Sequence, residues 1–302
     1  MGGGTAEAAQ HAIAYFQRGI QKDANYAPVY AGLALVNAEW VWGQSRPREK
    51  MPSARESALE ALALDDTLSD GHYALAIIRL FYDWDWVGAE KEFKRALQLN
   101  PNHALARAFY ARELVVLGRT DEAIAQATQA LELLPSPGVT DYPNWVFFLA
   151  HRYDLAEPLA RETVELAPNF VWGHYQLALV YEQTAKSEEA VQEYLKVEGL
   201  SGTDPEKIAR LGRAFARSGT RGFWKRRLED YRQSAKSHYV PSTLVAGLCL
   251  RVGDRNCAFQ WLQKGFQERD DLMINLKVDP VFDGVRSEPR FRDLMRRVSL
   301  PN

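Results

Sequence analysis

Apolar residues recur along the chain in a frame of about 34 positions. Each copy places small or aromatic residues at i, i+4 and i+7 and ends at Pro or a residue in its place. This spacing puts the three residues on one face of a helix, and Pro, which lacks an N–H group, ends that helix. Three copies are clearest, at 89–101, 123–135 and 156–168. Further copies begin at Ala12, Ala54, Ala190 and Ala258, for example as Ala12, Phe16 and Gly19.

A second kind of helix precedes each of these. It carries large residues at i and i+3 or i+4 beside a small one, a pattern typical of helices that approach a neighbour closely. Examples are the segments 30–34, 106–111 and 173–181. Between the two helices lies a turn such as Gly118-Arg-Thr-Asp121, where Gly permits a left-handed C-cap and Asp caps the next helix. The repeating unit is therefore a helix pair.

This pattern resembles the tetratricopeptide repeat over essentially residues 5–270. The resemblance implies an all-α fold, a right-handed α-α superhelix (solenoid) of about seven helix pairs. An orphan helix near 5–25 is expected before the pairs, and a capping helix within 271–302 is expected after them, in the same domain as 1–270. The expected pairs lie near 26–67, 69–102, 104–136, 137–169, 171–202, 205–237 and 239–269.

Three units depart from the pattern. In the second pair, Asp83-Trp-Asp-Trp86 is either a ligand-contacting loop or a helix start, with Asp85 capping the helix and the tryptophans packing between units. In the fourth pair, Pro137 and Pro143 predict a shortened or displaced first helix. In the sixth pair, Trp224 stands where a small crossing residue is expected.

The two ends of the repeat array differ. At the C-terminus, Phe291, Leu294 and Val298 have helical spacing and are expected to pack on the last pair. The N-terminus begins with the second helix of a unit, which favours the chain being the tail end of a larger protein. Residues 276–294, with 26–34 and 81–86, resemble the C-terminal repeat region of multidomain bacterial signalling proteins. That resemblance implies a sensing or docking half whose effector would be a winged-helix, kinase or cyclase domain.

Composition and charge indicate which partners and which cellular location suit the chain. The net charge is −2, from 37 basic and 39 acidic residues, which disfavours direct nucleic-acid binding. The most apolar stretch, 29–42, is too short and too polar to span a bilayer, and no secretory signal is visible. Two cysteines, Cys249 and Cys257, are expected to be reduced thiols. These observations predict a cytoplasmic protein.

Motifs for chemistry are missing from the sequence. The six histidines fall in different units or linkers, and no HExxH or Cys-x-x-Cys spacing occurs, so no metal is predicted. No phosphate-binding glycine loop and no G-x-S-x-G nucleophile motif is present. The chain is therefore predicted to be no enzyme, with no catalytic residues and no cofactor.

The family resemblance implies that first-helix side chains line a concave groove that holds peptides. The Lys and Asn residues by which some members clamp a C-terminal carboxylate are absent from the corresponding positions, such as Ala108 and Arg112. Aromatic and Arg side chains are frequent interface hot spots, which predicts a groove for an apolar-aromatic segment of a protein or peptide. The expected partner is thus a protein, with the chain monomeric or weakly homo-oligomeric. The alternative is a solenoid that senses a small molecule in an enclosed apolar pocket and controls a separate effector domain. The predicted groove residues are Tyr73, Arg112, Trp145, Phe148, Trp172, Tyr175 and Arg213.

Overall fold

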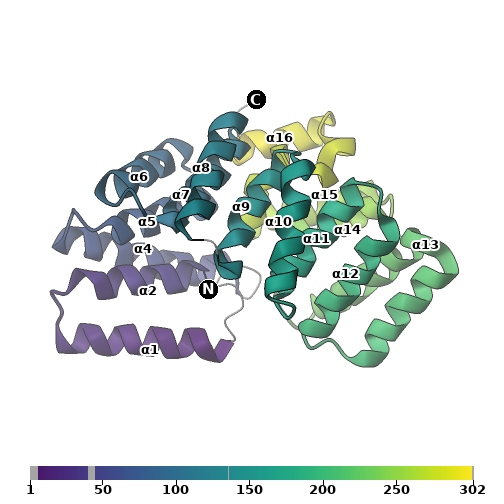
Figure 1. The fold of residues 1–302 in the computed structure, drawn as a ribbon, viewed down its shortest axis with the longest axis horizontal. Coiled ribbons are helices and arrows are strands. Elements are labelled where there is room, and N and C mark those ends of the chain that lie inside the picture. Colours follow the sequence, from purple (N-terminus) through teal and green to yellow (C-terminus); the bar gives the residue numbers. More distant parts are fainter. Residues whose placement is uncertain (1–5, 40–44, 135, 301–302) are drawn as a thin grey trace.

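The computed structural model describes residues 6–39, 45–134 and 136–300, and this part of the chain is helical without strands (Figure 1). The repeat helices are α1 (Ala6–Lys22), α2 (Ala27–Glu39), α4 (Pro47–Leu64), α5 (Ser69–Ile78), α6 (Trp86–Leu99), α7 (Ala104–Val116), α8 (Thr120–Leu133), α9 (Pro137–Leu149), α10 (Tyr153–Leu166), α11 (Val171–Gln183), α12 (Ser187–Leu200), α13 (Pro205–Ser234), α14 (Ser242–Arg251) and α15 (Arg255–Glu268). A π-helical turn, η1 (Arg79–Asp83), extends α5.

Consecutive helices pack as pairs, and the pairs stack into a curved array (Figure 1). The predicted all-α superhelix is therefore confirmed. Positions at i, i+4 and i+7 form the shared interior: Ala89, Phe93 and Ala96 of α6 are all fully buried. Alanine at such positions lets two helix backbones approach closely, because it has no side chain beyond Cβ to hold them apart.

Two irregular units keep their helices. The helix α9 has 13 residues, as many as α7 and α11, so the expected shortening is wrong. Pro137 sits in the first turn, where an N–H group has no partner within the helix. In α13, Ser218 and Gly219 leave the helical conformation, with φ of 61° at Gly219, and divide the helix into two parts. Trp224 in the second part is buried against the Tyr194 ring, 5.0 Å away.

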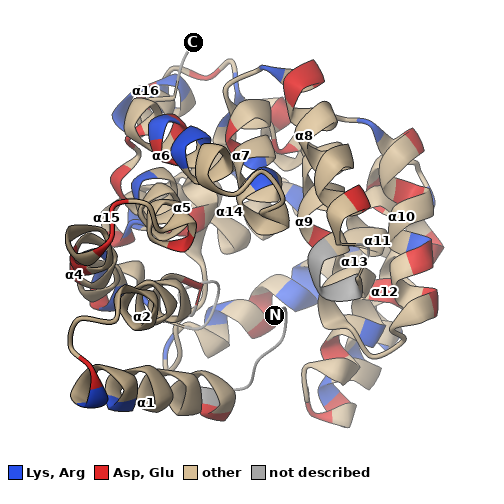
Figure 2. Ribbon diagram, turned by 60° about the vertical axis from the view of Figure 1, so that its left-hand side comes forward, with Lys and Arg blue, Asp and Glu red and all other residues tan. Residues whose placement is uncertain are grey.

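The C-terminal segment closes the array on itself. It consists of two 3-10 helices, η2 (Asp271–Lys277) and η3 (Pro280–Val285), followed by α16 (Pro289–Arg297). The helix α16 packs on α15 and also lies beside α6 (Figure 2). There the indole Nε1–H of Trp86 donates to the carbonyl of Val298 at 3.2 Å. The end of the chain thus contacts the second helix pair, 212 residues earlier.

Two further contacts join the C-terminal part of the chain to the second and fourth pairs. The guanidinium of Arg269 donates to the Tyr82 carbonyl at 3.3 Å, and His151 Nε2 lies 3.2 Å from the Val278 carbonyl. The inner side of the superhelix is therefore occupied by the chain's own C-terminal residues rather than left open.

Cys249 in α14 and Cys257 in α15 form a disulfide, with their Cα atoms 5.8 Å apart. The expectation of reduced thiols is therefore wrong for this structure. The turn at Gly253 and Asp254 brings the end of α14 beside the start of α15, which places the two cysteines together.

Across the described ranges, every helix falls short of the length and apolarity needed to cross a bilayer.

Candidate functional site

The Asp-Trp-Asp-Trp motif is a packing element. Asp85 Oδ1 accepts the Gly88 N–H at 3.0 Å and so caps α6, as one of the two interpretations predicts. The Trp84 ring lies 5.3 Å from Phe266 and 4.1 Å below the guanidinium of Arg269. The tryptophans therefore pack against the C-terminal part of the chain, across the superhelix, rather than between consecutive units.

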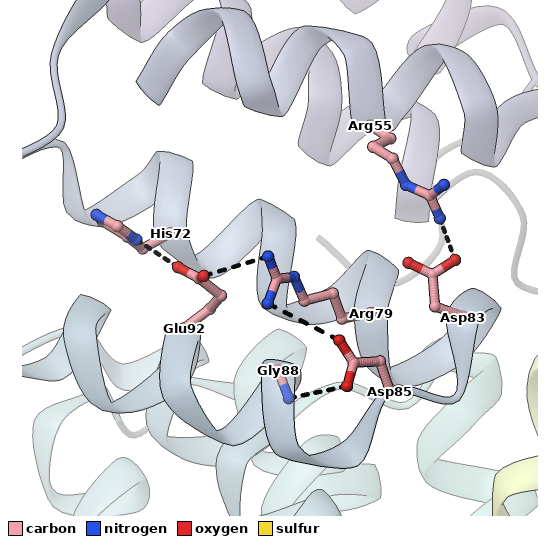
Figure 3. A network of polar contacts seen from close by, with 7 residues as sticks. All are labelled: Arg55, His72, Arg79, Asp83, Asp85, Gly88 and Glu92. Carbon is pink, nitrogen blue, oxygen red and sulfur yellow. Dashed lines mark hydrogen bonds and ion pairs between the residues drawn. The ribbon is translucent and has the colours of Figure 1, made fainter. Parts of the chain in front are cut away.

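A polar network ties the second pair together beside this motif (Figure 3). Glu92 lies 2.6 Å from His72 Nδ1 and 3.5 Å from Arg79, which in turn faces Asp85 at 3.8 Å. His72 Nε2 lies 3.0 Å from the Asp66 carbonyl, which only accepts, so Nε2 carries a proton and donates. This network joins α5 and η1 to α6 within the second pair.

The same arrangement of a histidine between a glutamate and a backbone carbonyl recurs in the fifth pair. His174 Nδ1 lies 2.5 Å from Glu193, and its Nε2 donates to the Pro168 carbonyl at 2.8 Å. Both partners, His174 and Glu193, are buried. Because the two histidines occupy equivalent positions of first helices, we interpret them as ties within a helix pair rather than as ligand-binding groups.

An aromatic ladder runs from the surface into the inner side of the superhelix. Trp172 is 41% exposed and meets the Tyr175 ring edge-on at 5.8 Å and 87°. Tyr175 stacks on Trp145 at 6.3 Å and 15°. The Arg112 guanidinium lies 5.7 Å from the Trp145 ring and 5.0 Å from that of Phe81. Burial lowers the pKa of Arg112 to about 10, although Asp271 acts in the opposite direction.

The other three predicted groove residues lie elsewhere. Tyr73 and Phe148 are 1% and 3% exposed, so they support the inner wall and present no face to a ligand. Arg213 projects into solvent from α13 and pairs with Glu206 at 2.5 Å. The structure therefore brings Arg112, Trp145, Trp172 and Tyr175 into one chain of contacts, leaves Phe148 behind Trp145, and sets Tyr73 and Arg213 apart.

A cluster that the sequence did not reveal lies behind the ladder. Arg251 binds Glu182 through Nε and Nη2, at 2.9 and 2.8 Å, and the Tyr194 hydroxyl donates to the same carboxylate at 2.6 Å. Arg227 lies 4.5 Å from the Tyr194 ring and pairs with Glu198 at 3.1 Å. Trp224, at a position where a small residue is expected, was the one signal in the sequence that pointed here.

This cluster surrounds a cavity of about 50 Å³. Its lining includes Trp145 and Tyr175 of the ladder and Asp279 and Phe282 of the C-terminal segment. A second hollow of about 420 Å³ lies over α5 and α6, among charged side chains that include Lys91 and Lys94. Within the described part of the chain, no three His, Cys, Asp or Glu side chains gather as a metal site would require.

Buried carboxyl groups in and near the segment have opposite pKa shifts. Burial disfavours ionisation of Glu182, but the contacts with Arg251 and Tyr194 outweigh it, so the pKa of Glu182 is lowered. Burial raises the pKa of Asp271 to about 8, and the neighbouring Asp270 adds to the shift. Burial also raises the pKa of Asp279. The first carboxyl is thus stabilised as an ion, whereas burial raises the pKa of the two carboxyls in the segment.

Comparison with known proteins places these features in a family. Residues 83–138 and 173–204 match sequence models of the tetratricopeptide repeat. Human protein O-mannosyl-transferase TMTC3 is 30% identical over 147 residues, which is 46% of this chain. The match spans only 16% of that protein's length.

Solved structures share the fold at 16% identity. A chain from the structure of the APC/C hetero-tetramer Cut9-Hcn1 aligns over 95% of this chain and 52% of its own length, with a TM-score of 0.58. Yeast Tom70 aligns over 96% and 62%, with a TM-score of 0.50. The type IV pilus biogenesis factor PilW aligns over 86% and 98%, also with a TM-score of 0.50. The two matches to sequence models of the repeat, together with the helix-pair period, the buried Ala-Phe-Ala positions and the stacked array, identify the chain as a tetratricopeptide repeat protein.

Proposed function

We propose that this chain is a non-catalytic scaffold that binds an apolar-aromatic segment of a protein or peptide on the aromatic ladder. Tetratricopeptide repeat proteins are in general protein-interaction scaffolds. The observation that carries the proposal is Trp172, a large side chain left 41% exposed at the outer end of the contacts through Tyr175 to Trp145. Exposed aromatic side chains that rest on a rigid base are typical interface hot spots.

The size of the inner cavity supports a peptide ligand over a metabolite. Pockets for small molecules enclose about 300–1,000 Å³, whereas the space behind the ladder is about 50 Å³. A single side chain of a ligand could enter such a space, while the rest of the ligand would lie over Trp172 at the surface. The ladder therefore suits a segment that inserts one residue.

The resemblance of residues 276–294 to the repeat regions of bacterial signalling proteins supports a docking or sensing role in a regulatory system. In that role the chain would hold a partner rather than convert a substrate. The match to the human transferase covers 16% of that protein, and the proposal assigns no transferase chemistry to this chain.

The test is selection of peptides followed by a point variant. Dodecapeptides displayed on phage are selected on the wild-type chain, and the dissociation constant of one selected peptide is measured by fluorescence anisotropy. Trp172→Ala should weaken binding at least about tenfold, in the range of hot-spot residues. Leu166→Ala, which changes another exposed apolar side chain (66% exposed), is the matched control and should change binding less than about twofold. Equal affinity of the wild type and the Trp172 variant would refute the proposed site.

A further inference from the structure

The helix α13 concentrates positive charge in a chain that is acidic elsewhere. It carries nine Lys or Arg residues and three Asp or Glu residues, a net charge of +6. Because the whole chain has a net charge of −2, the remainder carries −8. The basic residues recur every three or four positions, which places them along one side of each part of the helix. We call this set the α13 stripe: Lys207, Arg210, Arg213, Arg217, Arg221 and Lys225.

Most of the stripe has no counter-ion in the described part of the chain. The ion pairs of α13 involve Arg213, Arg226, Arg227 and Arg232, and only the first belongs to the stripe. That one, with Glu206, joins side chains that are 62% and 65% exposed. An exposed pair of this kind contributes little stability, so a ligand could replace Glu206 at small cost.

The first part of α13 contributes little to the interior of the fold. Within 205–217, Leu211 is the only described residue that is buried. Arginines in a packed helix are commonly held by neighbouring carboxylates, as Arg227 is by Glu198 in the second part. The stripe instead projects from a helix that lies at the edge of the molecule in Figure 1. Its charges are therefore available to another molecule.

We propose that the α13 stripe binds an extended acidic segment of a partner protein. This rests on the proposed function in taking the partner to be a protein, but it concerns a surface separate from the aromatic ladder. The first part of the stripe, from Lys207 to Arg217, spans about 15 Å of helix at about 1.5 Å per residue, and Arg221 and Lys225 lie beyond the break at Ser218 and Gly219. An extended chain covers this distance of about 15 Å with about five residues. Guanidinium groups bind carboxylates with two parallel hydrogen bonds, which suits a stripe composed mainly of Arg.

The surroundings disfavour a nucleic acid as the occupant. The preceding helix α12 packs on α13 and carries two exposed carboxylates in its first turn, Glu188 and Glu189. A duplex is wider than one helix and charged on every side, so it would meet these carboxylates as well as the stripe. Single strands are commonly held by stacking of bases on exposed aromatic rings, whereas Phe223 and Trp224 of α13 are buried. A single acidic peptide fits the narrow positive surface better.

The experiment uses fluorescein-labelled octaglutamate and the full 302-residue chain, with anisotropy measured in 50 mM and 200 mM salt. The variant Lys207→Gln, Arg217→Gln, Arg221→Gln, Lys225→Gln changes four exposed residues of the stripe. The matched control, Arg18→Gln, Lys22→Gln, Arg48→Gln, Lys91→Gln, removes the same charge from exposed residues on other helices. Wild type should bind, and more weakly at higher salt. The stripe variant should lose at least tenfold in affinity, and the control less than twofold.

Three results would overturn the inference. They are no binding of octaglutamate by the wild type in 50 mM salt, an equal loss in the stripe variant and the control, and tighter binding of an eight-nucleotide oligouridylate that the stripe variant abolishes. Circular dichroism of both variants verifies that the chain keeps its helical content. Trp172→Ala should leave octaglutamate binding unchanged, so a failure of the aromatic ladder and a failure of the stripe give different results.

Discussion

Removing Trp84 tests whether its contacts with the end of α15 hold the superhelix closed. The side chain is 4% exposed, between Phe266 and Arg269. A buried Trp removes about 200 Å² from water, which at about 25 cal/mol per Å² gives an upper value of about 5 kcal/mol. The Arg269 cation–π contact adds about 1 kcal/mol. Against these, the indole Nε1 is buried with no acceptor in the described structure, which costs about 1–3 kcal/mol.

The balance predicts that Trp84→Ala lowers the free energy of unfolding by about 3–5 kcal/mol, which is the usual range for Trp→Ala in a core. Trp84→Phe keeps most of the ring area and removes the unpartnered N–H, so it should change stability by less than about 1 kcal/mol. Both substitutions leave residue 84 at its φ of 59°, so the backbone conformation contributes equally to both.

The assay is urea unfolding together with hydrogen exchange of the amides in α16. In Trp84→Ala those amides should exchange faster, because the contacts of Phe266 and Arg269 with the second pair are lost. Trp172→Ala, a change at an exposed indole, is the control and should leave exchange in α16 unchanged. If Trp84→Ala altered stability by less than about 1 kcal/mol and left exchange in α16 unchanged, the closure of the superhelix would not depend on Trp84. If Trp84→Phe were as unstable as Trp84→Ala, the indole N–H would have a partner after all.

Three further predictions concern buried polar groups and the disulfide. Arg251→Met should lower the free energy of unfolding by about 3–5 kcal/mol, because it leaves the Glu182 carboxylate buried without its partner. Adding Glu182→Leu should recover most of this loss in urea unfolding. A double variant no more stable than the single variant would contradict the reasoning. The pKa of Asp271 is raised to about 8 in the folded chain. The protonated carboxyl therefore makes its full contribution to stability below about pH 4, and this contribution is lost as the pH rises to about 8. The free energy of unfolding should fall by at most about 1.4 kcal/mol per pH unit over this range. Asp271→Asn should therefore be more stable than wild type at pH 8 and lose this advantage near pH 4, and an unchanged pH slope would count against the shift. The Cys249–Cys257 disulfide closes a loop of eight residues, so its reduction should lower the free energy of unfolding by about 2.5 kcal/mol. Urea unfolding with and without reductant measures this, and a variant lacking both cysteines is the control. A midpoint of urea unfolding that reductant does not move would contradict the prediction.

Features that depend on nearby residues could be predicted from the sequence. The spacing of Ala89, Phe93 and Ala96 identifies the buried side of a helix, because i, i+4 and i+7 share a face. The capping role of Asp85 was one of two interpretations that the sequence offered, and the hydrogen bond to the Gly88 N–H shows it. For the candidate site, the aromatic residues 145, 172 and 175 were identified as one group, and their rings are in contact. Trp172 and Tyr175 are three residues apart in one first helix, and Trp145 lies in the first helix of the preceding pair.

What the sequence could not decide is which residues of distant repeats meet. The rotation between neighbouring pairs is small, but it accumulates over the array and determines whether the first pairs face the last. In this chain the accumulated turn brings Trp86 to Val298 and places Arg269 over Trp84. The C-terminal segment then fills the inner side and leaves Trp172 as the exposed end of the ladder. Local periodicity therefore determined the helices and their pairing, whereas the closure of the superhelix decided which of their side chains a partner can reach.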